Sequence, residues 1–101
     1  MRYVMRTLAE IDRARDLLRD APLPLVAARI SRARKDLGLS HDSLGERMGG
    51  VTRQHLIKLE KGKHRPTLAM LERIAEATGK PVDFFLVEEA GKPHPFPRKA
   101  A

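Results

Sequence analysis

The chain has no cysteine, no tryptophan and few other aromatic residues among its 101 positions. Without cysteine it can form no disulfide and no thiolate metal site, and thiol catalysis is excluded. No apolar run approaches the roughly 20 residues that a membrane-spanning helix needs, and residues 1–9 hold no continuous hydrophobic stretch. We therefore expect a cytoplasmic protein that is neither exported nor embedded in a membrane.

The chain does carry an excess of positive charge, which is distributed unevenly. Its formal net charge is +7 and its pI is about 10.4. Residues 25–66 hold 10 basic and 4 acidic side chains, whereas residues 67–91 hold 2 basic and 5 acidic ones. A dense positive field favours a polyanionic partner, and a field on one side of the molecule favours an oriented contact. The charge therefore points to nucleic acid.

Apolar residues recur at helical spacing almost throughout, so we predict an all-α fold. Serine and threonine at helix starts are N-cap residues, and glycine often follows a helix end. The predicted N-caps are Thr7, Ser40, Thr52 and Thr67, with Pro81 as the first residue of a short last helix. We divide the chain into an N-terminal helical extension (1–24), a five-helix domain (25–90) and a flexible, basic, proline-rich tail (91–101).

Two short predicted helices, residues 40–48 and 52–61, are separated by a turn with two glycines, which is the outline of a helix-turn-helix. With Leu56 and Leu59 assigned to the core, the second helix exposes side chains suited to reading bases. Arginine and lysine donate to guanine, glutamine pairs with adenine, and an aliphatic group contacts the thymine methyl. The exposed set is Arg53, Gln54, His55, Ile57, Lys58 and Lys61.

The stretch from Leu25 to Leu86 resembles the Cro/CI-type, or XRE-family, helix-turn-helix domain of small phage and bacterial repressors. The residues that carry the resemblance are Gly38-Leu39-Ser40, Leu44-Gly45, the run from Thr52 to Gly62, Arg65-Pro66-Thr67-Leu68, and Leu71, Ile74 and Ala75.

The resemblance implies roles for particular residues. Base reading falls to Arg53, Gln54 and Lys58, and phosphate contact to the residue after the second helix's cap, usually glutamine and here His41. The position where the two helices cross, usually alanine, is here a glycine. The turn holds one residue more than the usual spacing, as Gly50-Val51, so the recognition helix is expected to be rotated or shifted. An ion pair is implied between Arg34 and Glu60.

Several assignments stay open. His55 either reaches a base or phosphate or packs at the edge of the core, and Ile57 either contacts thymine or packs on a neighbouring helix. The four histidines lack metal-ligand spacing, and no nucleophile grouping is present, so we expect no metal, no cofactor and no enzymatic activity. Predicted phosphate contacts besides His41 are Thr52, Lys61, Lys63, His64 and Arg65.

The expected function is a sequence-specific repressor that binds double-stranded operator DNA as a homodimer on an inverted repeat. One alternative is the antitoxin of a toxin-antitoxin pair, and another is a protein-interaction adaptor that binds no DNA. The helix over residues 7–20 either packs on its own domain or binds a second copy or another protein through Leu8, Ile11 and Leu18.

Overall fold

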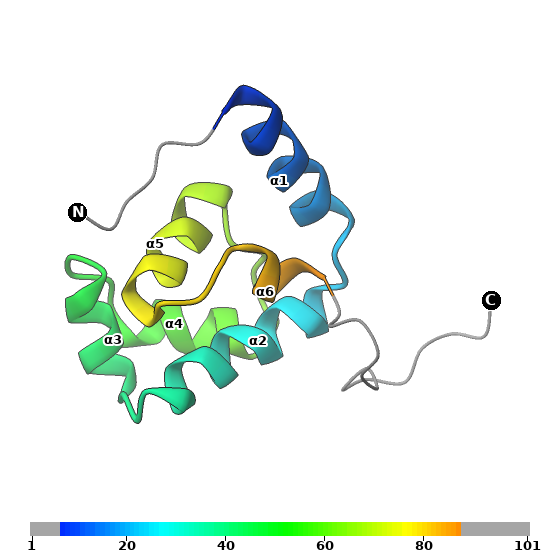
Figure 1. The fold of residues 1–101 in the computed structure, drawn as a ribbon. Coiled ribbons are helices and arrows are strands. Elements are labelled where there is room, and N and C mark those ends of the chain that lie inside the picture. The colour runs from blue at the N-terminus through cyan, green and yellow to red at the C-terminus, as the bar shows by residue number, and fades with distance from the viewer. Residues whose placement is uncertain (1–6, 88–101) are drawn as a thin grey trace.

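The computed structural model of the chain describes residues 7–87. This part is entirely helical, which confirms the predicted fold class, and the predicted tail (91–101) lies outside the described residues. The helices follow one another in a compact arrangement (Figure 1). They are α1 (Leu8–Asp20), α2 (Leu23–Asp36), α3 (His41–Arg47), α4 (Arg53–Glu60), α5 (Leu68–Thr78) and α6 (Asp83–Leu86).

The predicted N-caps start four of these helices. At α1, the Thr7 hydroxyl accepts a hydrogen bond from the Glu10 amide at 3.1 Å, and the Glu10 carboxylate accepts one from the Thr7 amide at 2.8 Å. This reciprocal pair satisfies two amides that the helix itself leaves unpaired. The side-chain oxygens of Ser40, Thr52 and Thr67 cap α3, α4 and α5 with one bond each, which they accept from the amide three residues on.

Two helix starts differ from the prediction. Helix α2 begins at Leu23, two residues before the predicted start of the five-helix domain at residue 25, with Pro22 as its cap and Pro24 in its first turn. Proline lacks an amide hydrogen, but the first-turn amides of a helix have no partner within it, so Pro24 is tolerated there. Helix α6 begins at Asp83 rather than at Pro81, whose carbonyl accepts from the Phe84 amide at 3.0 Å.

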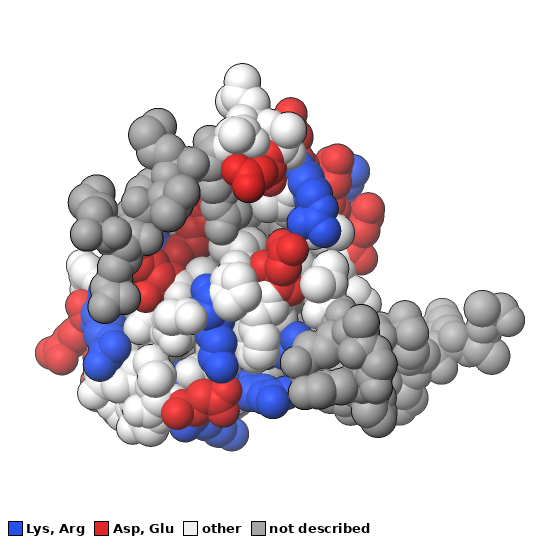
Figure 2. Space-filling view, viewed as in Figure 1, with Lys and Arg blue, Asp and Glu red and all other residues white. Residues whose placement is uncertain are grey.

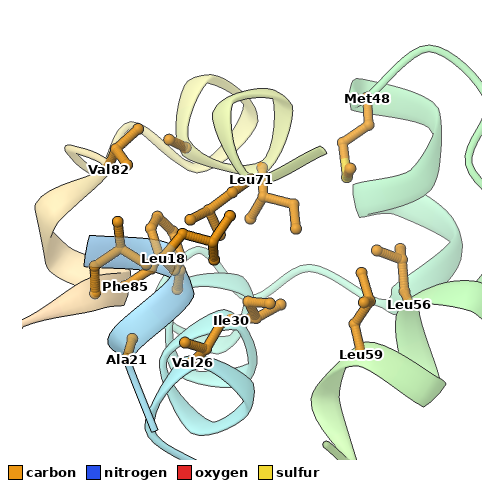
Figure 3. Packing of buried hydrophobic residues seen from close by; sticks show 14 of the residues in the cluster. Leu18, Ala21, Val26, Ile30, Met48, Leu56, Leu59, Leu71, Val82 and Phe85 are labelled. Carbon is orange, nitrogen blue, oxygen red and sulfur yellow. The ribbon is translucent and has the colours of Figure 1, made fainter. Parts of the chain in front are cut away.

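The hydrophobic core gathers residues from every helix (Figure 3). Helix α2 packs against α4, α5 and α6, and α3 packs against α4 and α5. The bulkiest side chains with almost no exposed surface come from five helices. They are Leu25, Ile30, Leu44, Leu56, Leu59, Leu71, Ile74 and Phe85.

Helix α1 contacts α5 and α6 of the same chain (Figure 1). Ala14 is 3% exposed and Leu18 is 8% exposed, whereas Leu8, in the first turn, is 79% exposed. The Arg13 guanidinium lies 3.1 Å from the Asp83 carboxylate of α6. The C-terminal half of α1 is therefore part of the domain's own core, and the apolar face that the sequence predicts is buried only from Ala14 onwards.

Arg29 is a buried cation whose role the sequence does not predict. Its side chain is 4% exposed, donates to the Phe84 carbonyl, and lies 5.0 Å from the centre of the Phe84 ring. Carbonyls and an aromatic face together offset part of the cost of removing a guanidinium from water. Arg29 thus fastens the single turn of α6 to α2.

Candidate nucleic-acid interface

Helices α3 and α4 form a helix-turn-helix pair that packs through its apolar side chains. Leu44 and Met48 of α3 and its flank are buried together with Leu56 and Leu59 of α4 (Figure 3). Burial of one face of α4 leaves the opposite face to solvent.

The turn between the two helices accommodates the extra residue through glycine. Gly49 and Gly50 have φ values of +90° and +105°, which only glycine adopts readily. The amides of Gly50 and Val51 both donate to the Gly45 carbonyl, at 2.9 and 3.1 Å. The turn is thereby closed against α3, and α4 still begins directly after its predicted cap.

The exposed face of α4 carries the residues that the sequence assigns to base reading. Arg53, Gln54 and Lys58 are exposed, and no acidic residue precedes Glu60 in this helix. His55 and Ile57 are half-buried, and Ile57 is not among the apolar residues packed against the core. The structure therefore brings three polar base-reading candidates onto one open surface, with His55 and Ile57 at its margins.

Arg34 of α2 and Glu60 of α4 form the ion pair that the resemblance implied. The Arg34 Nε and Nη2 atoms donate to the two Glu60 carboxylate oxygens at 2.8 and 3.0 Å, and both side chains are nearly buried. Arg34 Nη1 also donates to the Leu39 carbonyl at 2.8 Å. One guanidinium thus joins the C-terminal end of α4 to the loop before α3.

Burial alone would raise the pKa of the Glu60 carboxyl, but its hydrogen bond to Arg34 and the charge of Arg34, with a smaller contribution from His41, lower the pKa below its usual value of 4.5. Glu60 is therefore ionised at neutral pH. This carboxylate binds Arg34 inside the protein and does not form part of the exposed face of α4.

His41, a predicted phosphate contact, faces Glu60. Its Nε2 atom lies 3.2 Å from a Glu60 oxygen, and its side chain is 25% exposed. An ionised carboxylate can only accept, so Nε2 is the donor, and a neutral ring then keeps only an acceptor at Nδ1. The ring can donate to Glu60 and to a phosphate together only when it is protonated.

The basic loop after α4, residues 61–67, carries four exposed basic residues, which are Lys61, Lys63, His64 and Arg65. Arg65 also donates from Nη1 to the carbonyls of Leu18 and Ala21, at 2.8 and 2.7 Å, at the end of α1. Helix ends leave carbonyls without partners, and a guanidinium satisfies them well. Arg65 therefore serves the fold, a role that the sequence did not predict.

Asp42 is a residue of this surface that the sequence does not predict. This residue lies in the first turn of α3, and its carboxylate is 4.0 Å from the guanidinium of Arg53. Nothing in the periodicity of either helix predicts this contact, because it depends on how α3 and α4 cross.

The side of the molecule that carries α1 and α6 differs in charge from α4. Figure 2 shows Asp and Glu intermixed with Lys and Arg over this face. Helix α1 alone holds four acidic and three basic residues. Within residues 7–87, no group of three or more His, Asp or Glu side chains is placed to hold a metal ion. None of the helices described in that range is long and apolar enough to cross a membrane.

A comparison with protein families matches residues 30–85 to a helix-turn-helix model. This match covers more than half of the chain. The chain belongs to the helix-turn-helix family. Its domain is of the XRE, or Cro, type, as the sequence predicts, and helix-turn-helix domains of this type are DNA-binding domains of transcriptional regulators rather than enzymes.

Relatives of this helix-turn-helix protein occur in archaea and bacteria. An uncharacterised HTH-type transcriptional regulator of Methanothermobacter thermautotrophicus is 47% identical over 64 residues, which are 61% of this chain and 91% of the relative. One of Sinorhizobium medicae is 38% identical over 66 residues, 65% of this chain but only 47% of the relative. The chain thus spans about half the length of the rhizobial relative.

Among solved structures, the restriction-modification controller protein C.AhdI of Aeromonas hydrophila has a similar fold. The TM-score is 0.58 at 22% sequence identity, and the match covers 62% of this chain and 94% of that one. At this identity the likeness concerns the fold alone.

Proposed function

We propose that the protein is a sequence-specific repressor of transcription that binds double-stranded operator DNA. The observation that carries this proposal is the exposed face of α4. Arg53, Gln54 and Lys58 stand there together, and the only carboxylate of that helix, Glu60, is buried against Arg34. An ordinary solvated helix interleaves acidic and basic residues.

The recognition helix α4 would enter the major groove with its N-terminal half against the bases. Arg53 and Lys58 would donate to guanine, and Gln54 would pair with adenine. His55 and Ile57, half-buried at the margin, would contact bases or sugars at the edge of the site.

Phosphate contacts would flank the base-reading residues on both sides. Contacts of this kind fix the position of the protein without reading sequence. Arg65 is exposed, so its guanidinium can reach a phosphate while its Nη1 donates to two carbonyls at the end of α1. The proposed contacts are Thr52, His41, Lys61, Lys63, His64 and Arg65.

A dimer on an inverted repeat would supply the specificity that one recognition helix lacks. A helix of eight residues reads only a few base pairs, and two copies on half-sites about 34 Å apart double the sequence read. Repression would follow from occupying promoter DNA. The proposal places the protein in the cytoplasm, with its DNA.

The test is selection of bound sequences from a pool of random DNA duplexes, followed by affinity measurement on the selected site. The wild-type protein should enrich an inverted repeat. Arg53→Ala and Gln54→Ala should each cost about 1 to 3 kcal/mol and relax preference at particular base pairs. Failure to enrich any sequence, or unchanged preference in Arg53→Ala, would contradict the proposal and would favour a protein-interaction adaptor.

The oligomeric interface calls for a separate measurement. Deleting residues 7–20 would remove buried Ala14 and Leu18, so a point variant is preferable. Leu8 is 79% exposed, and Leu8→Glu should leave the fold intact. If residues 7–20 form the dimer, or hold a toxin as in the antitoxin alternative, this variant should lose that partner. We favour a dimer that persists in Leu8→Glu, since α1 packs on its own domain.

A further inference from the structure

Asp42 and Arg53 come from different helices and meet at the surface. Asp42 lies in the first turn of α3, and Arg53 is the first residue of α4. The Arg53 Nη1 atom is 4.0 Å from a carboxylate oxygen of Asp42. The two side chains are 56% and 69% exposed, so the pair stays open to solvent. A carboxylate therefore stands beside the first proposed base-reading residue.

Asp42 differs from its acidic neighbours in where it lies. Residues 37–66 hold three carboxylates, at positions 42, 46 and 60. Glu60 is buried against Arg34, and Glu46 lies one helical turn beyond Asp42 along α3. Asp42 is thus the exposed carboxylate that the crossing of α3 and α4 brings to the base-reading face.

We propose that Asp42 is a positioning residue that sets the base preference of Arg53; this inference rests on the proposed function. A guanidinium has five N–H donors, and a bidentate contact with guanine uses two of them. The donors that remain can stay on the Asp42 carboxylate. Holding the long Arg53 side chain near one conformation lowers the rotamer entropy that binding would otherwise remove.

The same carboxylate acts against non-specific binding. In non-specific complexes, basic side chains contact phosphates, and this attraction is independent of sequence. A phosphate that approaches Arg53 also approaches Asp42 and is repelled by it. A guanine edge, with neutral acceptors, meets no such repulsion. Asp42 therefore widens the difference between specific and non-specific binding.

A structural role alone would also explain an acidic residue in the first turn of α3, because negative charge there interacts favourably with the helix dipole. That role affects the stability of the fold and leaves base preference untouched. The two explanations therefore differ in what they predict for sequence discrimination.

The test uses the full chain and compares five variants by selection from random duplexes and by affinity for the selected and a scrambled duplex. Asp42→Asn is the test, Asp42→Glu the conservative rescue, and Glu46→Gln the control with the same charge change on the same helix. Arg53→Ala identifies the base pair that Arg53 reads. The double variant Asp42→Asn with Arg53→Ala shows whether Asp42 acts through Arg53, and thermal unfolding monitors folding.

We expect Asp42→Asn to lower discrimination at the base pair read by Arg53 by about two- to fivefold, the range that an exposed ion pair supports. Asp42→Glu should keep the discrimination of the wild type. In the Arg53→Ala background, Asp42→Asn should have no effect on discrimination. Discrimination equal to that of Glu46→Gln would overturn the inference, as would an undiminished effect in the Arg53→Ala background, which would mean that Asp42 reads a base itself. A wild-type protein that enriches no sequence would overturn the proposed function as well.

Discussion

The carbonyl oxygen of Val51 lies over the α-carbon of Gly45, so close that a β-carbon at position 45 would overlap it. Gly45 is in the middle of α3, and Val51 follows the two-glycine turn. The helix-turn-helix pattern usually has alanine at this crossing and a turn one residue shorter. The close approach of the Val51 carbonyl therefore requires glycine at position 45.

Gly45→Ala should destabilise the protein by about 1 to 3 kcal/mol, as overpacking does when a backbone atom has to move. The free energy of unfolding in urea measures this effect. Deleting Gly50 in the same chain should restore part of the lost stability, because it returns the turn to the usual length. Equal unfolding midpoints for wild type and Gly45→Ala would contradict the steric explanation.

Glu60→Gln should cost about 3 to 5 kcal/mol of unfolding free energy, because it leaves the Arg34 guanidinium buried without a counter-charge. Urea unfolding at neutral pH gives the value. Replacing both residues together, as Arg34→Met with Glu60→Leu, should cost less than Glu60→Gln alone. A double variant that is less stable than the single one would show that the pair contributes more than its charge balance.

The lowered pKa of Glu60 links stability to acid. A carboxyl whose pKa is lower in the folded than in the unfolded state stabilises the fold above the unfolded value, and this contribution is lost as the pH falls through the folded value. Stability should therefore decline as the pH falls below about 4.5, the usual value for this group. Unfolding midpoints of wild type and Glu60→Gln should converge in acid. Parallel pH profiles would exclude Glu60 as the source.

Leu18 and Leu8 of α1 form a matched pair for testing whether this helix belongs to the domain. Leu18 is 8% exposed and Leu8 is 79% exposed. Leu18→Ala should cost about 2 to 5 kcal/mol by leaving a cavity, and Leu8→Ala should change stability by no more than about 0.5 kcal/mol. Thermal unfolding distinguishes them. Similar small effects would place α1 outside the folded unit.

Arg65 and Lys63 are neighbours in one basic loop and should respond differently to alanine. Arg65→Ala removes a guanidinium from two carbonyls and should lower the unfolding temperature. Lys63→Ala should leave stability unchanged, weaken binding to all DNA sequences alike, and reduce the slope of log affinity against log salt by about 1. The reverse pattern would reassign the two residues.

Local patterns in the sequence predicted most of the fold. Each helix cap depends on residues only three positions apart, so the sequence predicts the caps at Thr7, Ser40, Thr52 and Thr67. The predicted domain boundary at residue 25 falls inside α2, because proline both ends and begins helices. In the candidate site, assigning Leu56 and Leu59 to the core predicted the exposure of Arg53, Gln54 and Lys58, whereas His55 and Ile57, predicted to be exposed, are half-buried.

Contacts between distant segments were not predictable in the same way. Arg65 reaches carbonyls 44 and 47 residues away, and Arg29 reaches one 55 residues away. A periodic pattern of apolar residues does not indicate contacts between residues so far apart in the sequence. The basic neighbours of Arg65 predict a phosphate contact, which stays a prediction, but they do not predict its bonds to helix-end carbonyls. The pairing of Arg34 with Glu60 was available only through resemblance to other helix-turn-helix domains.

The bonds from Arg65 to the end of α1 connect the first helix of the domain to the loop that follows the recognition helix. Loss of α1 would leave that guanidinium without its acceptors and the loop without its anchor. In native-state hydrogen exchange, the amides of residues 18–21 and of residues 61–67 other than Pro66 should therefore open together, as one cooperative unit. The first helix, α1, would in this way share its dynamics with the loop that follows the recognition helix, the loop that we propose contacts phosphate.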